Sequence, residues 1–259
     1  MGLKIICVAN QKGGVGKTTT AVNLAASLAA AEKPTLLIDC DPQANATSGL
    51  GVDQRSFQAH LYHVLLGRCG LREVFLPTDL AQLTLVPAAQ DLIGLEVEMI
   101  QHPKRERLLA SALAGLPGGL FSYVLIDCPP SLGLLTVNAL TASQTVLIPL
   151  QCEYYALEGL SHLIHTIRLV KSRLNPGLNI EGILLTMYDG RKNLSRQVEA
   201  EVRSHFGSKV FQTVIPRNVR LAEAPSHGKP VLLYDISCAG SRAYLDLASE
   251  LIQNHGEGK

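Results

Sequence analysis

Short apolar runs alternate with longer stretches of helical spacing along the chain. Seven runs are apolar almost throughout and carry many β-branched residues, and we expect each to form a strand: residues 4–9, 35–39, 83–87, 123–127, 145–150, 180–186 and 210–215. Apolar residues recur at helical spacing at 17–31, 89–113, 156–174, 194–206 and 239–254, which predicts helices there. Apolar strands that alternate with helices are typical of a mainly parallel twisted sheet with helices on both faces, so we predict an α/β fold.

The same alternation continues to the end of the chain. At 259 residues the chain can bury a sizeable core, and no low-complexity linker interrupts it, so we predict a single domain over residues 1–259. Residues 50–80 are the least regular part, and no helix-turn-helix module precedes the first predicted strand. The longest apolar runs are far too short to cross a bilayer, and no signal peptide is recognisable, so we expect a cytoplasmic protein.

The net charge limits what can be said about a nucleic-acid partner, and the cysteine content indicates the redox compartment. The net charge is +1, so a nucleic-acid partner must be argued from a local cluster of charge and not from the whole chain. The six cysteines are scattered without a C-x-x-C pair, and four lie in or beside apolar runs. Free structural thiols in a reducing compartment are therefore expected, rather than disulfides or a metal cluster.

A glycine-rich segment, ANQKGGVGKTTTAVNLAA at residues 9–26, follows the first predicted strand and opens the first predicted helix. In this context, backbone N–H groups and the helix N-terminus bind phosphate. The usual pattern G-x-x-x-x-G-K-[ST] is not met, because Gln11 stands at its first glycine. We expect Lys17 to reach the β- and γ-phosphates, Thr18 to bind Mg²⁺ and Thr19 to donate to the α-phosphate. The nucleotide-binding residues predicted in this segment are Lys12, Gly13, Gly14, Val15, Gly16, Lys17, Thr18 and Thr19.

Acidic residues end two of the predicted strands. Asp39 and Asp41 close the run LLIDCDPQ, and Asp127 closes VLIDCPPS. Ligands of open α/β sheets gather at the carboxyl ends of the strands. Asp127 best suits a Mg²⁺ ligand that acts through water, and Asp41 suits orienting or deprotonating a water at the γ-phosphate. For Asp39, a contact to the metal through water and a structural role in the turn are equally compatible with the sequence.

Six segments together resemble the ParA/Soj family of chromosome and plasmid partitioning ATPases: KGGVGKTT, IDCDPQANATSGLG, IDCPPSLGLLTVNAL, PLQCEYYALEGL, LLTMYDGR and TVIPRNVRLAEAPSHGKP. The resemblance runs essentially end to end. It implies an ATPase with ATP and Mg²⁺ as cofactors, a deviant Walker A loop and a homodimer that sandwiches two ATP molecules. One departure is Ala44, which stands in a switch-like loop where the family usually has glycine.

The resemblance also implies roles for individual residues. Lys12 matches the signature lysine that crosses the dimer to the partner's nucleotide, and Asp41 matches the residue needed for hydrolysis. Asp127 matches the Walker B acid, while Pro216 and Asn218 match positions that contact adenine. The expected catalytic set is therefore Lys12, Lys17 and Asp41.

The physical chemistry of Lys12 agrees with that implied role. A lone lysine at a loop entrance is usually solvated, but Gly13 and Gly14 are small enough to let another subunit approach closely. A second positive charge supplied in trans would neutralise charge on the γ-phosphate in the transition state, as an arginine finger does.

Positive charge is concentrated between residues 191 and 220. Seven basic residues in this window oppose Glu199 and Glu201, which gives the window a formal charge of +5. No base-reading motif accompanies them, so we expect phosphate contacts with double-stranded DNA of any sequence, and a solvated charged face is the alternative. The resemblance implies DNA contacts at Arg191 and Arg220. The full predicted DNA-binding set is Arg191, Lys192, Arg196 and Arg220, whereas Arg217 could serve the nucleotide instead.

The sequence therefore predicts a nucleotide-timed switch. ATP would favour a dimer that binds DNA on the nucleoid, and the resemblance implies a ParB-like partner that stimulates a slow hydrolysis. A MinD-like membrane switch is the main alternative, although the tail LASELIQNHGEGK is short and weakly basic for an amphipathic membrane helix. A nitrogenase-reductase-like electron carrier would need cluster-holding cysteines, and a metabolic ligase would need a substrate pocket.

Overall fold

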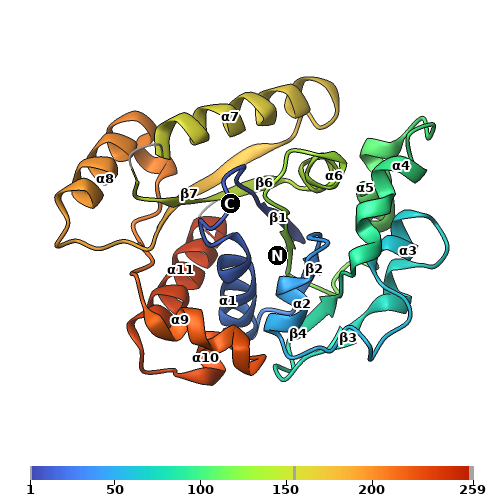
Figure 1. Ribbon diagram of the computed structural model, residues 1–259, viewed down its shortest axis with the longest axis horizontal. Coiled ribbons are helices and arrows are strands. Elements are labelled where there is room, and N and C mark those ends of the chain that lie inside the picture. The colour runs from blue at the N-terminus through green and yellow to red at the C-terminus, as the bar shows by residue number, and fades with distance from the viewer. Residues whose placement is uncertain (1, 154–155, 257–259) are drawn as a thin grey trace.

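Seven strands form one sheet in the computed structural model of the chain, which describes residues 2–153 and 156–256 (Figure 1). Tyr154 and Tyr155 of the PLQCEYYALEGL motif and the last three residues of the tail lie outside the described residues. The strands are β1 (Lys4–Val8), β2 (Thr35–Asp39), β3 (Leu76–Pro77), β4 (Leu83–Val86), β5 (Tyr123–Asp127), β6 (Thr145–Gln151) and β7 (Asn179–Thr186). They lie in the order β3-β4-β2-β5-β1-β6-β7, and each neighbouring pair is parallel except β3 with β4. The prediction of a mainly parallel sheet is confirmed.

Helices cover both faces of the sheet (Figure 1). One face packs against α1 (Lys17–Ala30), α2 (Asn45–Gly49), α9 (Val219–Glu223), α10 (Val231–Tyr234) and α11 (Ala239–Gly256). The other packs against α3 (Leu61–Leu65), α4 (Leu95–Glu98), α5 (Leu108–Ala114), α6 (Leu134–Ala142), α7 (Ala156–Arg173) and α8 (Asn193–Phe206). The strands separate two apolar cores, since Ile6 and Val8 of β1 face the first and Cys7 faces the second. This two-sided burial explains why the strands are apolar on both faces.

The predicted strand at 210–215 is wrong. Among the described residues, this segment forms one isolated bridge with β7, between Val210 and Ile183, and no continuous ladder. The backbone N–H groups of Gln212 and Thr213 donate instead to the carboxylate of Glu250 on α11, at 2.7 and 3.0 Å. The N–H groups of Phe211 and Ile215 still donate to β7, at 3.0 and 2.8 Å, so a side-chain acceptor from a distant helix interrupts a regular strand pairing between them.

The predicted helix at 89–113 is broken into short pieces. A 3₁₀ segment (Gln90–Gly94) leads into α4, and another 3₁₀ turn (Arg105–Arg107) precedes α5. Pro103 lies in the connection between them. Proline has no N–H to donate and disfavours helical geometry at the residue before it, so the apolar spacing alone overstated the length of the helix. Further 3₁₀ turns lie at Leu71–Val74, Gly207–Lys209 and Ala224–His227.

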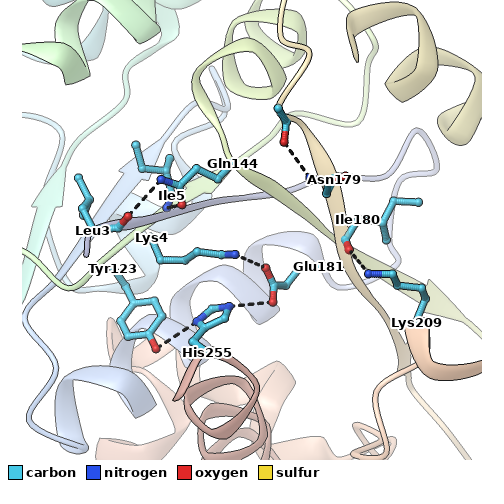
Figure 2. A network of polar contacts seen from close by, with 11 residues as sticks. Leu3, Lys4, Ile5, Tyr123, Gln144, Asn179, Ile180, Glu181, Lys209 and His255 are labelled. Atoms are coloured by element: carbon cyan, nitrogen blue, oxygen red, sulfur yellow. Dashed lines mark hydrogen bonds and ion pairs between the residues drawn. The ribbon is translucent and has the colours of Figure 1, made fainter. Parts of the chain in front are cut away.

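A buried polar network fixes α11 to the amino end of the sheet, opposite the carboxyl ends of the strands (Figure 2). The side chain of Glu181 on β7 is 8% exposed, and its carboxylate lies 3.2 Å from Lys4 Nζ and 2.9 Å from His255 Nε2. The other ring nitrogen of His255 lies 3.3 Å from the Tyr123 hydroxyl. Burial by itself would raise the pKa of Glu181, but the hydrogen bond with His255 and the charge of Lys4 outweigh it and lower the pKa to about 2.

Replacing this carboxylate should therefore have a pH-dependent effect on stability. The folded pKa of Glu181 lies below its ordinary value, so its contribution is present above about pH 4.5 and is lost as the pH falls toward about 2. We expect Glu181→Gln to lower the free energy of unfolding by about 2 kcal/mol at neutral pH and by much less at about pH 3. Urea titrations of both proteins followed by circular dichroism would measure the difference. An equal loss at both pH values would contradict the ionised role of Glu181.

Candidate nucleotide-binding site

The glycine-rich loop connects the end of β1 to the start of α1. Gly14 and Gly16 adopt the left-handed region, with φ of 74° and 86°, which a residue with a Cβ atom adopts only under strain. Val15 is buried between them, and its carbonyl oxygen accepts a 2.9 Å hydrogen bond from the Thr186 hydroxyl on β7. In the part of the chain that the structure describes, no side chain caps the N-terminus of α1, so its first N–H groups are available to an anion.

Lys17 is the buried lysine of this loop. Its residue is 6% exposed, and its ammonium group donates to the backbone oxygen of Lys12 at 3.0 Å, across the loop. Burial lowers the pKa of Lys17, and the negative charges of Asp127 and Asp41 act in the opposite direction. A buried cation at the start of a helix, with carboxylates nearby, suits a polyanion such as a nucleotide phosphate chain.

Asp127 ends β5 directly beside the loop. It is fully buried, its backbone pairs with Val8 at the end of β1, and neither of its carboxylate oxygens has a hydrogen-bond partner among the described residues. Burial and then the charge of Asp39 raise the pKa of Asp127 well above its ordinary range, while Thr18 and Lys17 oppose this shift. An unpartnered buried carboxylate is costly without a counter-ion, so this position fits a bound Mg²⁺ with its waters.

Asp39 ends β2 and pairs in register with Asp127. Its carboxylate is occupied, because it accepts hydrogen bonds from the backbone N–H of Asp41 at 3.1 Å and from the N–H and hydroxyl of Thr47, both at 2.8 Å. Burial raises the pKa of Asp39 to about 6, although these hydrogen bonds favour the ionised form. The geometry therefore gives Asp39 a structural task, which is to hold the loop between β2 and α2.

Asp41 lies within that loop. It is 6% exposed, and its Oδ1 accepts from the N–H of Gln43 at 2.9 Å. Ala44, which follows, is fully buried and adopts a left-handed conformation with φ of 52° as the N-cap of α2. Such a conformation favours glycine, which gives a physical reason for the glycine that related sequences are expected to carry here. The loop that positions Asp41 is thus held partly in a strained backbone geometry.

Lys12 lies at the outer edge of the loop. Its backbone N–H donates to Asn10 Oδ1 at 3.0 Å, and its ammonium group forms an ion pair with Glu153, which follows β6. The side chains of Lys12 and Glu153 are 42% and 45% exposed, so the pair contributes only about 0.2–1 kcal/mol to stability and is easily exchanged. Sequence reasoning missed Glu153, because 141 residues separate it from Lys12 and no motif announces the contact.

The two residues expected at the adenine lie where the loop can reach them. Pro216 and Asn218 line a cavity of about 360 Å³ together with Gly16 and Thr19 of the loop. Met187, Leu221 and Tyr244 complete its apolar wall. The cavity therefore joins the segment of Pro216 and Asn218 to the glycine-rich loop in one continuous site. Apolar walls with a few polar groups are typical of a site for a nucleotide base.

The basic residues of the 191–220 window do not form one cluster. Lys209 donates to the carbonyl of Ile180 near the start of β7, whereas Arg191 follows the end of that strand. Several of the others are paired within the chain, since Arg203 contacts Glu199, Arg191 contacts Asp189 and Arg220 contacts Glu223 and Asp235. Arg196 contacts the side chain of Asn193, and Lys192 precedes α8 on the exposed surface. The formal charge of +5 thus overstates the free positive charge.

The described residues contain no other arrangement suited to a metal. Among them, no group of three or more His, Cys, Asp or Glu side chains could hold an ion. A Mg²⁺ at Asp127 would therefore take most of its ligands from Thr18, water and phosphate oxygens, as Mg²⁺ commonly does. All six cysteines are free, and Cys7, Cys40, Cys128 and Cys152 are buried.

Comparison with known proteins gives a consistent result. A family model described as an AAA domain matches residues 3–180. The chromosome partitioning protein ParA of Myxococcus xanthus is 58% identical over 96% of this chain and 88% of its own length. The sporulation initiation inhibitor protein Soj of Bacillus subtilis is 54% identical over 97% and 99% of the two chains.

A solved structure shares the fold over nearly the whole chain. It is cobyrinic acid a,c-diamide synthase from Mycobacterium smegmatis with bound ADP and magnesium, which is 37% identical and gives a TM-score of 0.87. The match covers 99% of this chain and 97% of that one. Its name is that of a metabolic enzyme, but the two relatives above are more similar in sequence, with 58% and 54% identity.

Proposed function

Because the chain belongs to the ParA/Soj family of chromosome partitioning proteins, we propose that it is a Mg-ATP-dependent switch. In this proposal ATP brings two chains together as a dimer that binds DNA without sequence preference, and hydrolysis separates them. The observation that carries it is the pair of lysines in one loop: Lys17 is buried and its ammonium group lies on the Lys12 carbonyl, whereas the Lys12 side chain is exposed at the outer edge. A loop that only holds phosphate needs one of them.

The site supports binding of ATP and Mg²⁺. Lys17 and the N-terminus of α1 would bind the phosphates, and the cavity at Pro216 and Asn218 would take the adenine. Thr18 and Asp127, the latter through water, would hold the metal, and Asp39 is a second candidate for water-mediated contact. The metal would neutralise charge on the β- and γ-phosphates.

Hydrolysis would depend on two further side chains. Asp41 is buried, and its loop position beside the phosphate end of the site suits orienting or deprotonating the attacking water. Lys12 would leave its exposed partner Glu153 and neutralise the γ-phosphate of the neighbouring subunit. The family suggests that a ParB-like protein stimulates this step. Intrinsic turnover should be slow, because a switch that hydrolyses quickly cannot persist on DNA.

The alternative of a MinD-like membrane switch has less support. Among the described residues, none of the helices combines the length and apolar character needed to span a bilayer. The apolar residues of α11, including Leu247 and Leu251, are buried in the core shared with α1. This helix is therefore not free to lay an apolar face on a membrane. We accordingly propose the cytoplasm, with association to the nucleoid, as the place where the protein acts.

Sedimentation with and without DNA tests the proposal. ATP should convert the chain from monomer to dimer and make it co-sediment with random-sequence duplex DNA, whereas ADP should do neither. If Arg191 and Arg220 of both subunits neutralise phosphates, DNA affinity should fall about 100-fold between about 50 and 200 mM salt. The reason is that releasing counterions from the DNA gains less free energy as the salt concentration of the solution rises. A monomer in saturating ATP, or a flat salt response, would contradict the proposal.

A matched pair of substitutions serves as the control. Arg191 and Arg55 are equally exposed and each pairs with an aspartate two residues earlier, but Arg55 lies outside the 191–220 window. Arg191→Glu should weaken DNA binding and leave ATP binding intact, whereas Arg55→Glu makes the same change of charge and should leave both unchanged. If the two variants bind DNA equally well, the expected DNA contact at Arg191 is wrong.

A further inference from the structure

Two of the arginines expected to contact DNA, Arg191 and Arg220, already pair with carboxylates of their own chain. Arg191 forms a two-pronged pair with Asp189, with Nε to Oδ1 at 2.9 Å and Nη2 to Oδ2 at 3.1 Å. The side chain of Arg191 is 91% exposed, while that of Asp189 is 16% exposed. This is the planar geometry with which arginine also binds phosphate, so a phosphate bound through Nε and Nη2 would compete with Asp189 for the same edge of the guanidinium.

Arg220 is held on several sides. Its Nη1 lies 2.8 Å from the Glu223 carboxylate and its Nε lies 3.3 Å from that of Asp235. The centre of the Tyr234 ring lies 6.0 Å from the guanidinium carbon of Arg220. The Tyr234 hydroxyl donates a 3.2 Å hydrogen bond to the carboxylate of Glu223. Two carboxylates around one guanidinium leave a negative local charge, which repels an approaching phosphate.

Both arginines belong to segments that line the base cavity. Asp189 follows Met187, a cavity residue in a left-handed conformation with φ of 49°. Asn218, another cavity residue, caps α9 by accepting from the N–H of Arg220 at 2.9 Å. The turn at Tyr188 is hydrogen-bonded to the segment that carries Asn218, through the N–H of Arg217 at 3.1 Å. A nucleotide in the cavity would therefore contact the backbone on which both pairs are built.

We propose that carboxylates of the chain itself compete with nucleic-acid phosphate for two arginines and so set the DNA affinity of the chain. Asp189 competes for Arg191, and Glu223 together with Asp235 competes for Arg220. The inference rests on the DNA binding proposed above and extends it to the residues that restrain it. A phosphate that binds the same N–H groups must displace these carboxylates, and one that binds the remaining N–H groups meets their negative charge. Because the arginine of each pair is solvent-exposed, a phosphate can reach it and displace the carboxylate, which it could not do in a fully buried pair.

The matched geometry at Asp53 makes the test specific. Asp53 pairs with Arg55 through the same two prongs, at 3.2 and 3.0 Å, on an exposed surface outside the basic window. We expect Asp189→Asn to tighten binding to random-sequence duplex DNA, measured by fluorescence anisotropy with ATP, by about three- to tenfold, and Asp53→Asn to leave it unchanged. The gain should disappear in the double variant Asp189→Asn with Arg191→Gln. Asp235→Asn should also tighten DNA binding. Because Asp235 lies at the other arginine, this second variant keeps the inference testable if Asp189→Asn does not fold.

The outcomes separate this inference from the proposed function. Equal affinities for Asp189→Asn and Asp53→Asn would overturn it, and so would a gain that persists without Arg191, because the effect would then be one of net charge. If the wild-type chain fails to bind DNA but Asp189→Asn binds, the competition is supported. If neither binds at low salt with ATP, both the DNA-binding proposal and the competition are wrong.

Discussion

Lys12→Ala is expected to lower the rate of ATP hydrolysis by about 10³-fold, the size of effect that a charge supplied in trans has in related phosphoryl transfers. Negative charge is spread over the γ-phosphate oxygens in the transition state, and Lys17 with Mg²⁺ would neutralise only part of it. The exposed position of Lys12 at the edge of the loop leaves it free to reach a second chain. Steady-state phosphate release at saturating ATP would measure the loss.

Glu153→Gln provides the control for this prediction. The variant removes the ion pair that Lys12 makes within the chain but keeps the lysine itself. If Lys12 acts only by stabilising the loop through Glu153, both variants should lose activity to the same degree. If Lys12 acts on the nucleotide, Glu153→Gln should retain far more activity than Lys12→Ala. Normal turnover in Lys12→Ala would show that this lysine is merely solvated.

The sheet and the phosphate-binding loop were predictable because local sequence determines them. Strands buried on both faces must be apolar throughout, and a left-handed turn before a helix requires glycines such as Gly14 and Gly16. The carboxyl ends of parallel strands meet at one edge, which is why Asp39 and Asp127 could be placed together from sequence. Residues tied to backbone geometry of this kind are visible in a single sequence.

Contacts between distant segments were not predictable in this way. Segment 210–215 has the composition of a strand, yet Glu250 of α11 accepts the hydrogen bonds of Gln212 and Thr213 and interrupts the pairing with β7. Asp235 lies outside the basic window that seemed to carry a charge of +5, but folding places it beside Arg220. Charge counted along the sequence ignores such neighbours. The free positive charge of a surface therefore depends on the fold as well as on composition.

Asp41→Ala is expected to reduce hydrolysis by about 10²–10⁴-fold while leaving ATP binding and dimer formation in place. Within residues 2–153 and 156–256, the carboxylate of Asp41 accepts a single local hydrogen bond, from Gln43, whereas Asp39 holds the rest of the loop through Thr47. Loss of Asp41 should therefore remove the group that orients water without unfolding the loop. Sedimentation should show a dimer that persists in ATP, and a monomeric variant in saturating ATP would contradict this role.

Mixing the two inactive variants decides whether Lys12 acts across the dimer. In a heterodimer of Lys12→Ala with Asp41→Ala, one nucleotide has an intact Asp41 from its own chain and an intact Lys12 from the partner. If Lys12 acts in trans, equal amounts mixed before ATP is added should recover about a quarter of the wild-type rate, because half of the dimers are mixed and each has one complete site. If Lys12 acts on its own nucleotide, neither site of the heterodimer is complete, and mixing should recover nothing.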